Sequence, residues 1–444
     1  MKRKRTLVWL LAVMLVLLLS APGLSATASE LRNEVLETEV LETIDAISSE
    51  LIAMNDWMYH NPEAGYEEYE AVKLLTSYLQ KQGFTVEIGS GGLDTAFKAT
   101  FQHGEGGPVL TYAVEYDALR GPGGENFHGC QHNMQGPIGI GAAVALKRAM
   151  EKHDVPGTIW VIGTPAEEIP PPAKSKMLEA GVFEGTDVLM MYHGSGQTSR
   201  LQAGWSGITL DATRYIFTGK SAHASGDPWN GRDALDAARL MFNAVDAYRE
   251  HILPDARIHG VIPQGGEAPN VIPPLAVADF FYRHPTREYV DKMGERLKNI
   301  ALGMALATDT QVKIENYGKY YNTLALESLE ERAFDYAKEL GATQINENKQ
   351  FGASTDFAEL TGYFPSICLS VASKPADAAG HSIEAANASI APIGHNALVI
   401  SAKTLALLGL DLLTDPAYLQ EVKDEFETYG DPPTLETYIK ETRW

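Results

Sequence analysis

The chain has 444 residues, a length that favours two domains over a single core. Its apolar share of 45% and charged share of 21% are ordinary for a globular protein. The formal net charge of −22 argues against nucleic acid as a partner, because phosphate binding needs a basic surface.

The first 28 residues have the pattern of a secretory signal peptide. A basic segment, Lys2–Arg5, precedes an apolar run, Leu7–Leu19, and Ala26-Thr27-Ala28 fits the small-x-small cleavage rule. No later stretch is expected to be long and apolar enough to cross a membrane. We therefore expect residues 1–28 to direct export to the periplasm or the extracellular space. The alternative is an uncleaved N-terminal anchor.

Export makes a disulfide possible, and the chain has two cysteines, Cys130 and Cys368. Cys368 lies in the apolar run FPSICLSVA, and we interpret it as a small core residue of a buried strand. A Cys130–Cys368 bridge is the alternative, and it would remove Cys130 from any metal site.

Residues 31–205 alternate helices with short apolar strands. Helices are predicted over 31–61, where Pro62 ends the first one, and over 66–82. The strand PVLTYAVEY, a helix over 138–152, the strand TIWVIGTP, a helix near 174–180 and the strand DVLMMYH follow. This alternation indicates an α/β sheet that helices cover on both faces.

The pattern changes over residues 206–317. The order there is a strand ITLDATRYIFTG, a helix over 232–251, the strands RIHGVIPQGG and LAVADFFYR, a helix over 287–306 and a strand QVKIENY. This β-α-β-β-α-β order is the ferredoxin-like unit.

The α/β pattern returns over 318–413, with a helix over 326–340, the strand FPSICLSVA and a helix over 394–413. We therefore expect an α/β domain with a mixed, mostly parallel sheet, formed by residues 31–205 and 318–413. The ferredoxin-like α+β domain is inserted between the two parts. Residues 414–444 are predicted to be an acidic, partly helical C-terminal extension.

Six side chains with the chemistry of metal ligands follow the apolar strands. Because a parallel sheet binds ligands at the carboxyl ends of its strands, we expect them to lie together. Thiolate, imidazole and carboxylate groups in this mixture suit zinc or a neighbouring first-row divalent ion. The set exceeds the needs of one tetrahedral ion and therefore indicates two ions that share a ligand. The residues are Cys130 and His132 in the loop Gly121–Asn133, Glu167 and Glu168 after TIWVIGTPA, His193 after DVLMMY, and His381 in the loop after FPSICLSVA.

Two adjacent glutamates favour a division of roles. One can bind metal, while the other takes a proton from metal-activated water as a general base. Each signal is weak when taken singly. A Cys-x-His pair is as common in loop packing, a Glu-Glu pair usually lies on a solvated surface, and a lone His193 is as often a core histidine.

Taken together, these motifs resemble the aminoacylase/carboxypeptidase-like metallo-amidohydrolases of peptidase family M20. The resemblance is to the branch that contains p-aminobenzoyl-glutamate hydrolase, hippurate hydrolase and the auxin-conjugate hydrolases, and it covers Leu31–Leu413. The matching segments, in order, are HNPEAGYEE (60–68), EYDAL (115–119), HGCQHN (128–133), GTPAEE (163–168), MMYH (190–193), GKSAHAS (219–225), GGEAPNVIP (265–273), STDF (354–357) and GHSIEA (380–385).

The resemblance implies a catalytic α/β domain with a dinuclear metal site and an inserted lid that also forms a homodimer. The two divalent ions are expected to be zinc, with manganese, cobalt or nickel as alternatives. The implied general base is Glu167. The implied metal ligands are Cys130, His132, Glu168, His193 and His381, with Cys130 as the bridge.

The resemblance also assigns roles to three residues of the lid. His223 is implied to stabilise the tetrahedral oxyanion, often from the partner subunit, and fixed donors help most at such a developing charge. Asn270 and Arg283 are implied to hold the carboxylate of the substrate, for which a guanidinium is well shaped. Without the resemblance, His223 would be a capping or surface histidine and Arg283 an ordinary exposed charge on a strand.

Several positions depart from the family pattern. Gln131 stands where glycine is usual, and Arg120 and Gly194 each stand where proline is usual. The loop Gly121–Phe127 and the prolines Pro170–Pro172 are also unusual. We expect these positions to lie around the mouth of the pocket and to affect the choice of substrate rather than the metal chemistry.

The sequence thus predicts metal-dependent hydrolysis of the amide bond in N-acyl or N-aroyl amino acids that carry a free carboxylate. A dipeptidase or carboxypeptidase with the same site is the alternative enzyme. A non-catalytic protein that captures peptides or acyl-amino acids is the alternative from another class, and Glu167 beside a full ligand set argues against it.

Overall fold

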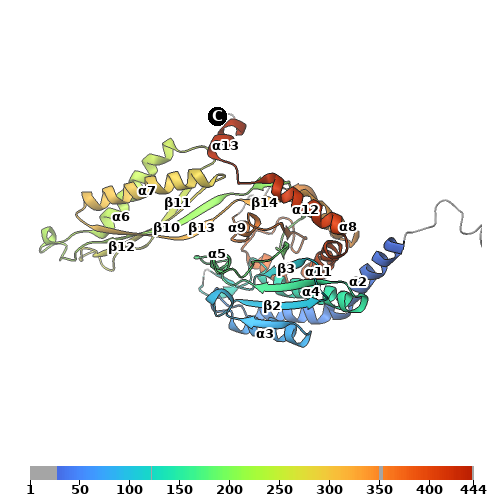
Figure 1. Cartoon of the computed structure of the whole chain (residues 1–444). Helices are drawn as coiled ribbons and strands as arrows, with labels where there is room; N and C mark the ends of the chain where they lie inside the picture. Colours follow the sequence, from blue (N-terminus) through green and yellow to red (C-terminus); the bar gives the residue numbers. More distant parts are fainter. Residues whose placement is uncertain (1–27, 122, 350–353, 443–444) are drawn as a thin grey trace, which may run out of the picture.

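A computed structural model describes residues 28–121, 123–349 and 354–442, and Figure 1 shows the arrangement of their elements. The predicted signal peptide and its cleavage site lie outside the described residues, apart from Ala28, where helix α2 begins.

The α/β domain is built on a six-stranded sheet with the order β1-β2-β6-β3-β7-β16. The four strands from β6 to β16 run parallel to one another, whereas β1 and β2 form an antiparallel edge. The strands are β1 (Thr85–Ile88), β2 (Phe97–His103), β3 (Val109–Val114), β6 (Gly157–Gly163), β7 (Val188–Tyr192) and β16 (Ser366–Leu369). The prediction of a mixed, mostly parallel sheet is confirmed.

Helices cover both faces of this sheet. Alternate residues of β3 point to opposite sides, so that Tyr112 lies in the larger core and Ala113 in the smaller one. The larger core is closed by α2 (Ala28–His60), α3 (Tyr69–Lys81), α4 (Gln135–His153), α8 (Glu327–Glu339) and α11 (Pro392–Thr414). The smaller core is closed by α5 (Ala173–Glu179) and α9 (Phe357–Thr361).

Glycines let helix α4 approach its neighbours closely. A Cβ atom on Gly139 would lie 2.5 Å from Val114, and one on Gly141 would lie 2.6 Å from Leu51. Helix α11 is the one helix among the described residues that is long and apolar enough to cross a membrane, which the sequence analysis did not anticipate. Since 78% of its most apolar window is buried in the protein, α11 is a core helix.

The inserted domain, for which the name lid is kept below, is a four-stranded antiparallel sheet with the order β11-β12-β10-β13 and two helices on one face. This is the ferredoxin-like topology, as predicted. The apolar residues of the lid helices and of alternate strand positions form a separate core. The elements are β10 (Thr209–Thr218), α6 (Ala234–Tyr248), β11 (Arg257–Gln264), β12 (Leu275–His284), α7 (Arg287–Ala307) and β13 (Gln311–Tyr320).

The C-terminal extension contacts both parts of the molecule (Figure 1). Helix α12 (Pro416–Tyr429) lies on the α/β domain, where Glu425 accepts hydrogen bonds from the backbone of Glu327 and Ser328. Helix α13 (Leu435–Thr442) lies on the lid, where the ring of Tyr438 packs 5.0 Å from that of His284.

Several short elements complete the chain. The strands among them were not predicted from the sequence, and neither were β1 and β2 of the main sheet. Short polar strands carry little periodicity, which is why they are hard to predict. The short elements are the strand pairs β4 (Leu119–Arg120) with β5 (Asn126–Phe127), β8 (Thr198–Leu201) with β15 (Ile345–Lys349) and β9 (Gly204–Ser206) with β14 (Thr323–Ala325), the helix α10 (Ile383–Ala388), and the 3-10 helices η1 (Ser90–Gly92), η2 (His132–Met134), η3 (Pro228–Asn230) and η4 (Arg249–His251).

Candidate metal centre and active site

The six predicted metal-site residues meet at the carboxyl edge of the four parallel strands. Cys130 lies in the loop between β5 and η2, and His132 begins η2. Glu167 and Glu168 follow β6, His193 follows β7, and His381 lies in the loop after β16. Adjacent parallel strands end at the same edge of a sheet, which is why segments far apart in the sequence meet there.

Three overlapping groups of side chains each have ligand atoms within 4.8 Å of one another. They are Cys130–His132–His193, Cys130–Glu168–His381 and His132–Glu167–Glu168. Cys130 Sγ lies 3.4 Å from His193 Nε2, and Glu168 Oε1 lies 3.9 Å from His132 Nε2 and 4.0 Å from His381 Nε2. Cys130, His132 and Glu168 each belong to two of these groups, so these three side chains link the groups into one cluster.

Contacts at Nδ1 orient the rings of His132 and His193. His132 Nδ1 lies 2.9 Å from Asp117 Oδ1, and the other oxygen of Asp117 accepts a hydrogen bond of 2.8 Å from the backbone N–H of Glu168. His193 Nδ1 donates to the carbonyl of Gly194 at 3.1 Å. These bonds leave Nε2 of each ring facing the cluster, which is the usual way in which a protein orients metal-binding histidines.

Two buried atoms of the cluster have no hydrogen-bond partner among the described residues: His132 Nε2 and Glu168 Oε1. Glu115 Oε2 lies 3.2 Å from His132 Nε2 without forming a hydrogen bond to it. Buried polar atoms normally find a partner. Free lone pairs on an imidazole and a carboxylate, next to a thiol, therefore fit divalent metal ions.

Burial and like charge dominate the electrostatics of the cluster. Burial raises the pKa of Cys130, and burial together with the charges of Glu115 and Glu168 holds the pKa of Glu167 well above its usual range. Burial also lowers the pKa of His193 to about 4. Protons are thus favoured on the acids, an effect that cations at the site would oppose. They are disfavoured on this imidazole, which keeps it neutral, as a metal ligand has to be.

A buried ion network lies behind the cluster, and the sequence analysis did not predict it. Lys174 Nζ lies 2.6 Å from Glu115 Oε1 and 2.6 Å from Asp356 Oδ1, and all three side chains are fully buried. Burial raises the pKa of Glu115, but Lys174, by its charge and its hydrogen bond, outweighs this together with the charges of His132 and His193 and brings that pKa down to about 2. Glu115 and Asp356 lie in the segments EYDAL and STDF, which were the available signals.

Glu68 is a further buried acid that had no predicted role. Its Oε1 accepts a hydrogen bond of 2.8 Å from the backbone of Ala166, which has a φ of 54°. That left-handed conformation turns the chain directly before Glu167 and Glu168. Burial raises the pKa of Glu68 to about 7.

Two of the predicted lid residues lie far from the cluster in the same chain. β10 and β12 pair from Thr209–His284 at one end to Thr218–Leu275 at the other, a length of about 30 Å at roughly 3.3 Å per residue. Arg283 lies at the end next to the α/β domain. His223 and Asn270 belong to loops at the opposite end, where their segments pair with each other.

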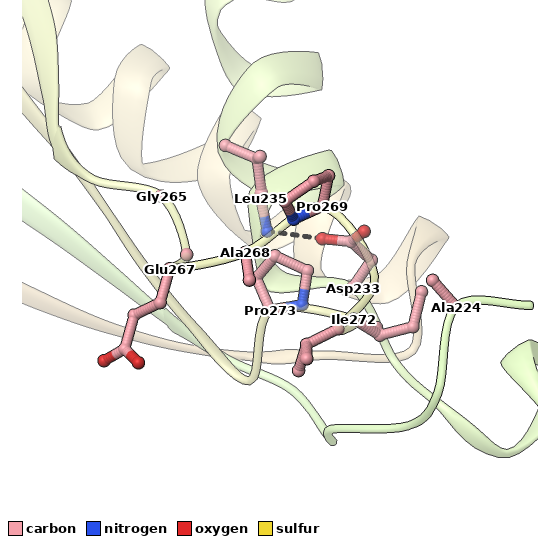
Figure 2. Close-up of a pocket in the computed structure, with 11 residues that line it drawn as sticks. Ala224, Asp233, Leu235, Gly265, Glu267, Ala268, Pro269, Ile272 and Pro273 are labelled. Carbon is pink, nitrogen blue, oxygen red and sulfur yellow. Dashed lines mark hydrogen bonds between the residues drawn. The ribbon is translucent and has the colours of Figure 1, made fainter.

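A pocket of about 380 Å³ lies at that distant end of the lid, and Figure 2 shows it. The two loops that carry His223 and Asn270 line it through Ala224 on one side and through Gly265–Pro269 and Val271–Pro273 on the other. His223 Nδ1 accepts backbone hydrogen bonds from Ser225 at 3.2 Å and Gly226 at 3.1 Å. The neutral ring therefore carries its proton on Nε2, where it can be donated to a ligand.

Arg283 is half-buried, and its Nε is buried without a hydrogen-bond partner among the described residues. Burial lowers the pKa of its guanidinium. An unpaired cation of this kind is suited to an anionic group of a ligand.

The alternative of a Cys130–Cys368 bridge and the predicted place of Gln131 are both wrong. Both cysteines are free, and Cys368 packs against the smaller core. Gln131 is 2% exposed and therefore does not lie at the pocket mouth, whereas Arg120 is exposed and Gly194 is half-buried.

Comparisons with known proteins give consistent matches. Residues 113–406 match the family model described as peptidase family M20/M25/M40. The chain is 31% identical to the Xaa-Arg dipeptidase of Mus musculus over 425 residues, which cover 91% of this chain and 95% of the relative. It is 28% identical to a subunit of the p-aminobenzoyl-glutamate hydrolase of Escherichia coli, over 88% of this chain and 94% of the relative.

Two solved structures show the same fold. An aminobenzoyl-glutamate utilization protein from Klebsiella pneumoniae matches with a TM-score of 0.65 and 17% identity, over 84% of this chain and 97% of that one. A dinuclear metal binding peptidase of the M20 family from Bacillus subtilis matches with a TM-score of 0.60 and 22% identity, over 83% of this chain and 99% of that one.

Proposed function

Because this chain belongs to peptidase family M20/M25/M40 and is an enzyme that acts on amides, we propose that it hydrolyses N-acyl or N-aroyl amino acids with a free carboxylate in a metal-dependent reaction. The observation that carries the proposal is the cluster of unpaired ligand atoms around Cys130, with Glu167 beside it.

We assign two divalent ions to this cluster, with zinc as the first candidate and manganese, cobalt or nickel as alternatives. Cys130 would be shared between them. When bound, such ions supply Lewis acidity to the amide carbonyl and to the attacking water. The five proposed ligands are Cys130, His132, Glu168, His193 and His381.

Glu167 is the proposed general base. It belongs to the group with His132 and Glu168 but not to the two groups that contain Cys130. Burial raises its pKa, which makes its carboxylate a stronger proton acceptor. In the proposed reaction Glu167 takes a proton from the attacking water and returns it to the leaving amine.

The lid residues are proposed to complete the site across a homodimer. Arg283, whose Nε has no partner within the described part of the chain, is suited to bind the substrate carboxylate from the same chain. His223 and Asn270 lie about 30 Å away along β10 and β12, so a second subunit has to supply them. His223 is suited to donate its Nε2 proton to the developing oxyanion, with Asn270 as a further donor to the substrate.

A dipeptidase is the second candidate function. It is favoured by the match of 31% identity to a relative named Xaa-Arg dipeptidase. The relative that is a subunit of p-aminobenzoyl-glutamate hydrolase favours the aroyl amino acid. In both cases the scissile bond is an amide next to an amino acid carboxylate, so one site suits both.

Export is also part of the proposal. It rests on the basic segment, apolar run and cleavage pattern of residues 1–28, and a cell fractionation with an antibody to the chain tests it.

The main test is a panel of substrates with the wild type and the Glu167→Gln variant, each loaded with zinc, manganese or cobalt. The panel contains benzoyl-amino acids, acyl-glutamates and dipeptides, including some that end in arginine. Wild-type turnover is expected, with a loss of about 10²–10⁴-fold in the variant and no loss of bound metal. If the metal-loaded wild type binds panel members but turns over none, the alternative of a binding protein replaces this proposal.

Mixing two inactive variants tests the shared site. The Glu167→Gln and His223→Ala variants are each expected to be nearly inactive, and mixed dimers of the two recover one functional site. A mixture as inactive as its components would show that His223 does not act on the partner subunit.

A further inference from the structure

Gln131 lies between the two proposed metal ligands of its loop and is buried. Its side chain is 2% exposed, and its backbone has a φ of 65°, a left-handed conformation that few non-glycine residues adopt. A buried amide at a strained position in a loop calls for an explanation from its contacts.

The amide of Gln131 makes hydrogen bonds to the loop that delivers His381. Its Oε1 accepts a bond of 2.6 Å from the hydroxyl of Ser373, and its Nε2 donates a bond of 2.7 Å to the carbonyl of Ala385. Ser373 follows β16, and Ala385 lies in helix α10, four residues after His381. Both ends of the His381 loop are therefore fixed to one side chain.

Ser373 extends these contacts to the loop after β7. Its hydroxyl accepts a bond of 3.1 Å from the backbone N–H of Ser195, and its own N–H donates to the carbonyl of Ser195 at 2.8 Å. Ser195 lies two residues after His193. Three loops that carry proposed ligands thus converge on Gln131 and Ser373.

Gly194 provides the space for the Gln131 amide. A Cβ atom at Gly194 would lie 2.3 Å from Gln131 Oε1 and 3.0 Å from its Cβ. The absence of a side chain at Gly194 and the long side chain of Gln131 are therefore complementary in shape.

We propose that Gln131 is a positioning residue, which holds the loops of Cys130, His132, His193 and His381 at the spacing that two divalent ions require. Glu168 is not part of this arrangement, because Asp117 holds its backbone instead. The inference rests on the proposed metal site and deepens it. It also replaces the expectation that Gln131 selects the substrate.

The first test compares Gln131→Met with the wild type. Methionine keeps the length of the side chain and removes its hydrogen bonds, and Gln102→Met on the exposed edge of β2 is the matched control. The metal affinity, measured by competition with a chromogenic chelator, is expected to fall by about 10–100-fold in Gln131→Met alone. Its kcat with limiting metal falls as well, while KM values and the order of preferred substrates stay unchanged.

The second test changes Gly194, which lies against the amide of Gln131, and it does not depend on the folding of a single variant. Gly194→Ala is expected to lower the metal affinity in the wild-type background and to have little effect in a Gln131→Gly background, where the clashing amide is gone. Gly303→Ala is the control, because a Cβ atom there meets nothing within 4 Å.

The outcomes separate the inference from the proposed function. A wild type that binds no divalent metal removes the proposed function itself. If the wild type binds metal, Gln131→Met binds it with equal affinity, and the effects of Gly194→Ala and Gln131→Gly are additive, then only the role of Gln131 is contradicted. If Gln131→Met prefers the substrates in a different order but binds metal as tightly as the wild type, Gln131 affects the choice of substrate, as first expected.

Discussion

Asp117 Oδ1 lies 2.9 Å from Nδ1 of His132, and this contact determines which ring nitrogen faces the metal cluster. The second oxygen of Asp117 accepts a bond from the backbone of Glu168, so one carboxylate contacts two proposed ligands that follow two different strands.

The Asp117→Asn variant is expected to bind divalent metal about 10–100-fold more weakly, because an amide weakens its hold on His132 and on the Glu168 backbone. Chelator competition on the purified protein measures this. Asp154→Asn is a matched control, since Asp154 pairs with His103 at 2.9 Å on the surface. Equal metal affinity in wild type and Asp117→Asn would mean that the pair does not orient a ligand.

The Lys174→Met variant is expected to unfold about 3–5 kcal/mol more easily, because Glu115 and Asp356 then remain buried without their cation. Urea denaturation followed by fluorescence measures this difference. The control Lys73→Met removes an exposed partner of Glu70 and should change the free energy of unfolding by less than about 1 kcal/mol. A second change, Asp356→Asn, should recover part of the loss, and the absence of any recovery would contradict the explanation by charge.

We expect the free energy of unfolding to decrease at alkaline pH because of the buried carboxyl group of Glu330. Burial raises its pKa from 4.5 to about 8 in the folded chain. Its stabilising contribution is therefore complete below pH 4.5 and is lost as the pH rises through about 8, since the folded state binds more protons in this window.

Replacing Glu330 by Gln should leave the stability unchanged at acidic pH and raise it by at least about 1 kcal/mol at pH 9, since one pKa unit corresponds to about 1.4 kcal/mol. The glutamine oxygen can still accept the backbone bond of 2.9 Å from Leu201. Thermal unfolding at several pH values tests this, and parallel pH profiles for the two proteins would show that Glu330 does not titrate in this range.

Ending the chain after Gly430 should lower the local stability of the lid. The truncation removes α13, whose Leu435 N–H donates to Glu288 at 3.0 Å and whose Tyr438 bonds to Asp255. Hydrogen exchange at the start of α7 and the end of β12 is expected to report a loss of about 1–3 kcal/mol of local stability. Tyr438→Phe keeps the ring contact with His284 and should lose less. Unchanged exchange would show that α13 does not support the lid.

The sequence was sufficient to predict the six residues of the cluster because each follows an apolar strand. The edge of a parallel sheet gathers such positions, so spacing along the chain becomes proximity in space. The ferredoxin-like lid could be predicted for a similar reason, since its strands and helices have clear periodicity.

Long-range polar contacts could not be predicted from the sequence in this way. Lys174 looks like one more lysine of an amphipathic helix, and nothing local shows that Glu115 and Asp356 surround it. Gln131 looked like a residue of an open glycine-rich loop, and only its bonds to Ser373 and Ala385 show that it is buried. Partners that lie 59 to 254 residues apart leave no pattern in either segment.

The cluster draws its ligand atoms from four loops between Cys130 and His381, so no short fragment of the chain contains a complete set. The chain has to close long loops before these atoms meet, unlike small zinc domains in which metal and fold form together. Under the proposed function, metal that binds the folded chain would stabilise it by mass action. The supply of metal during production would then set how much of the chain survives unfolding, as well as how active each molecule is.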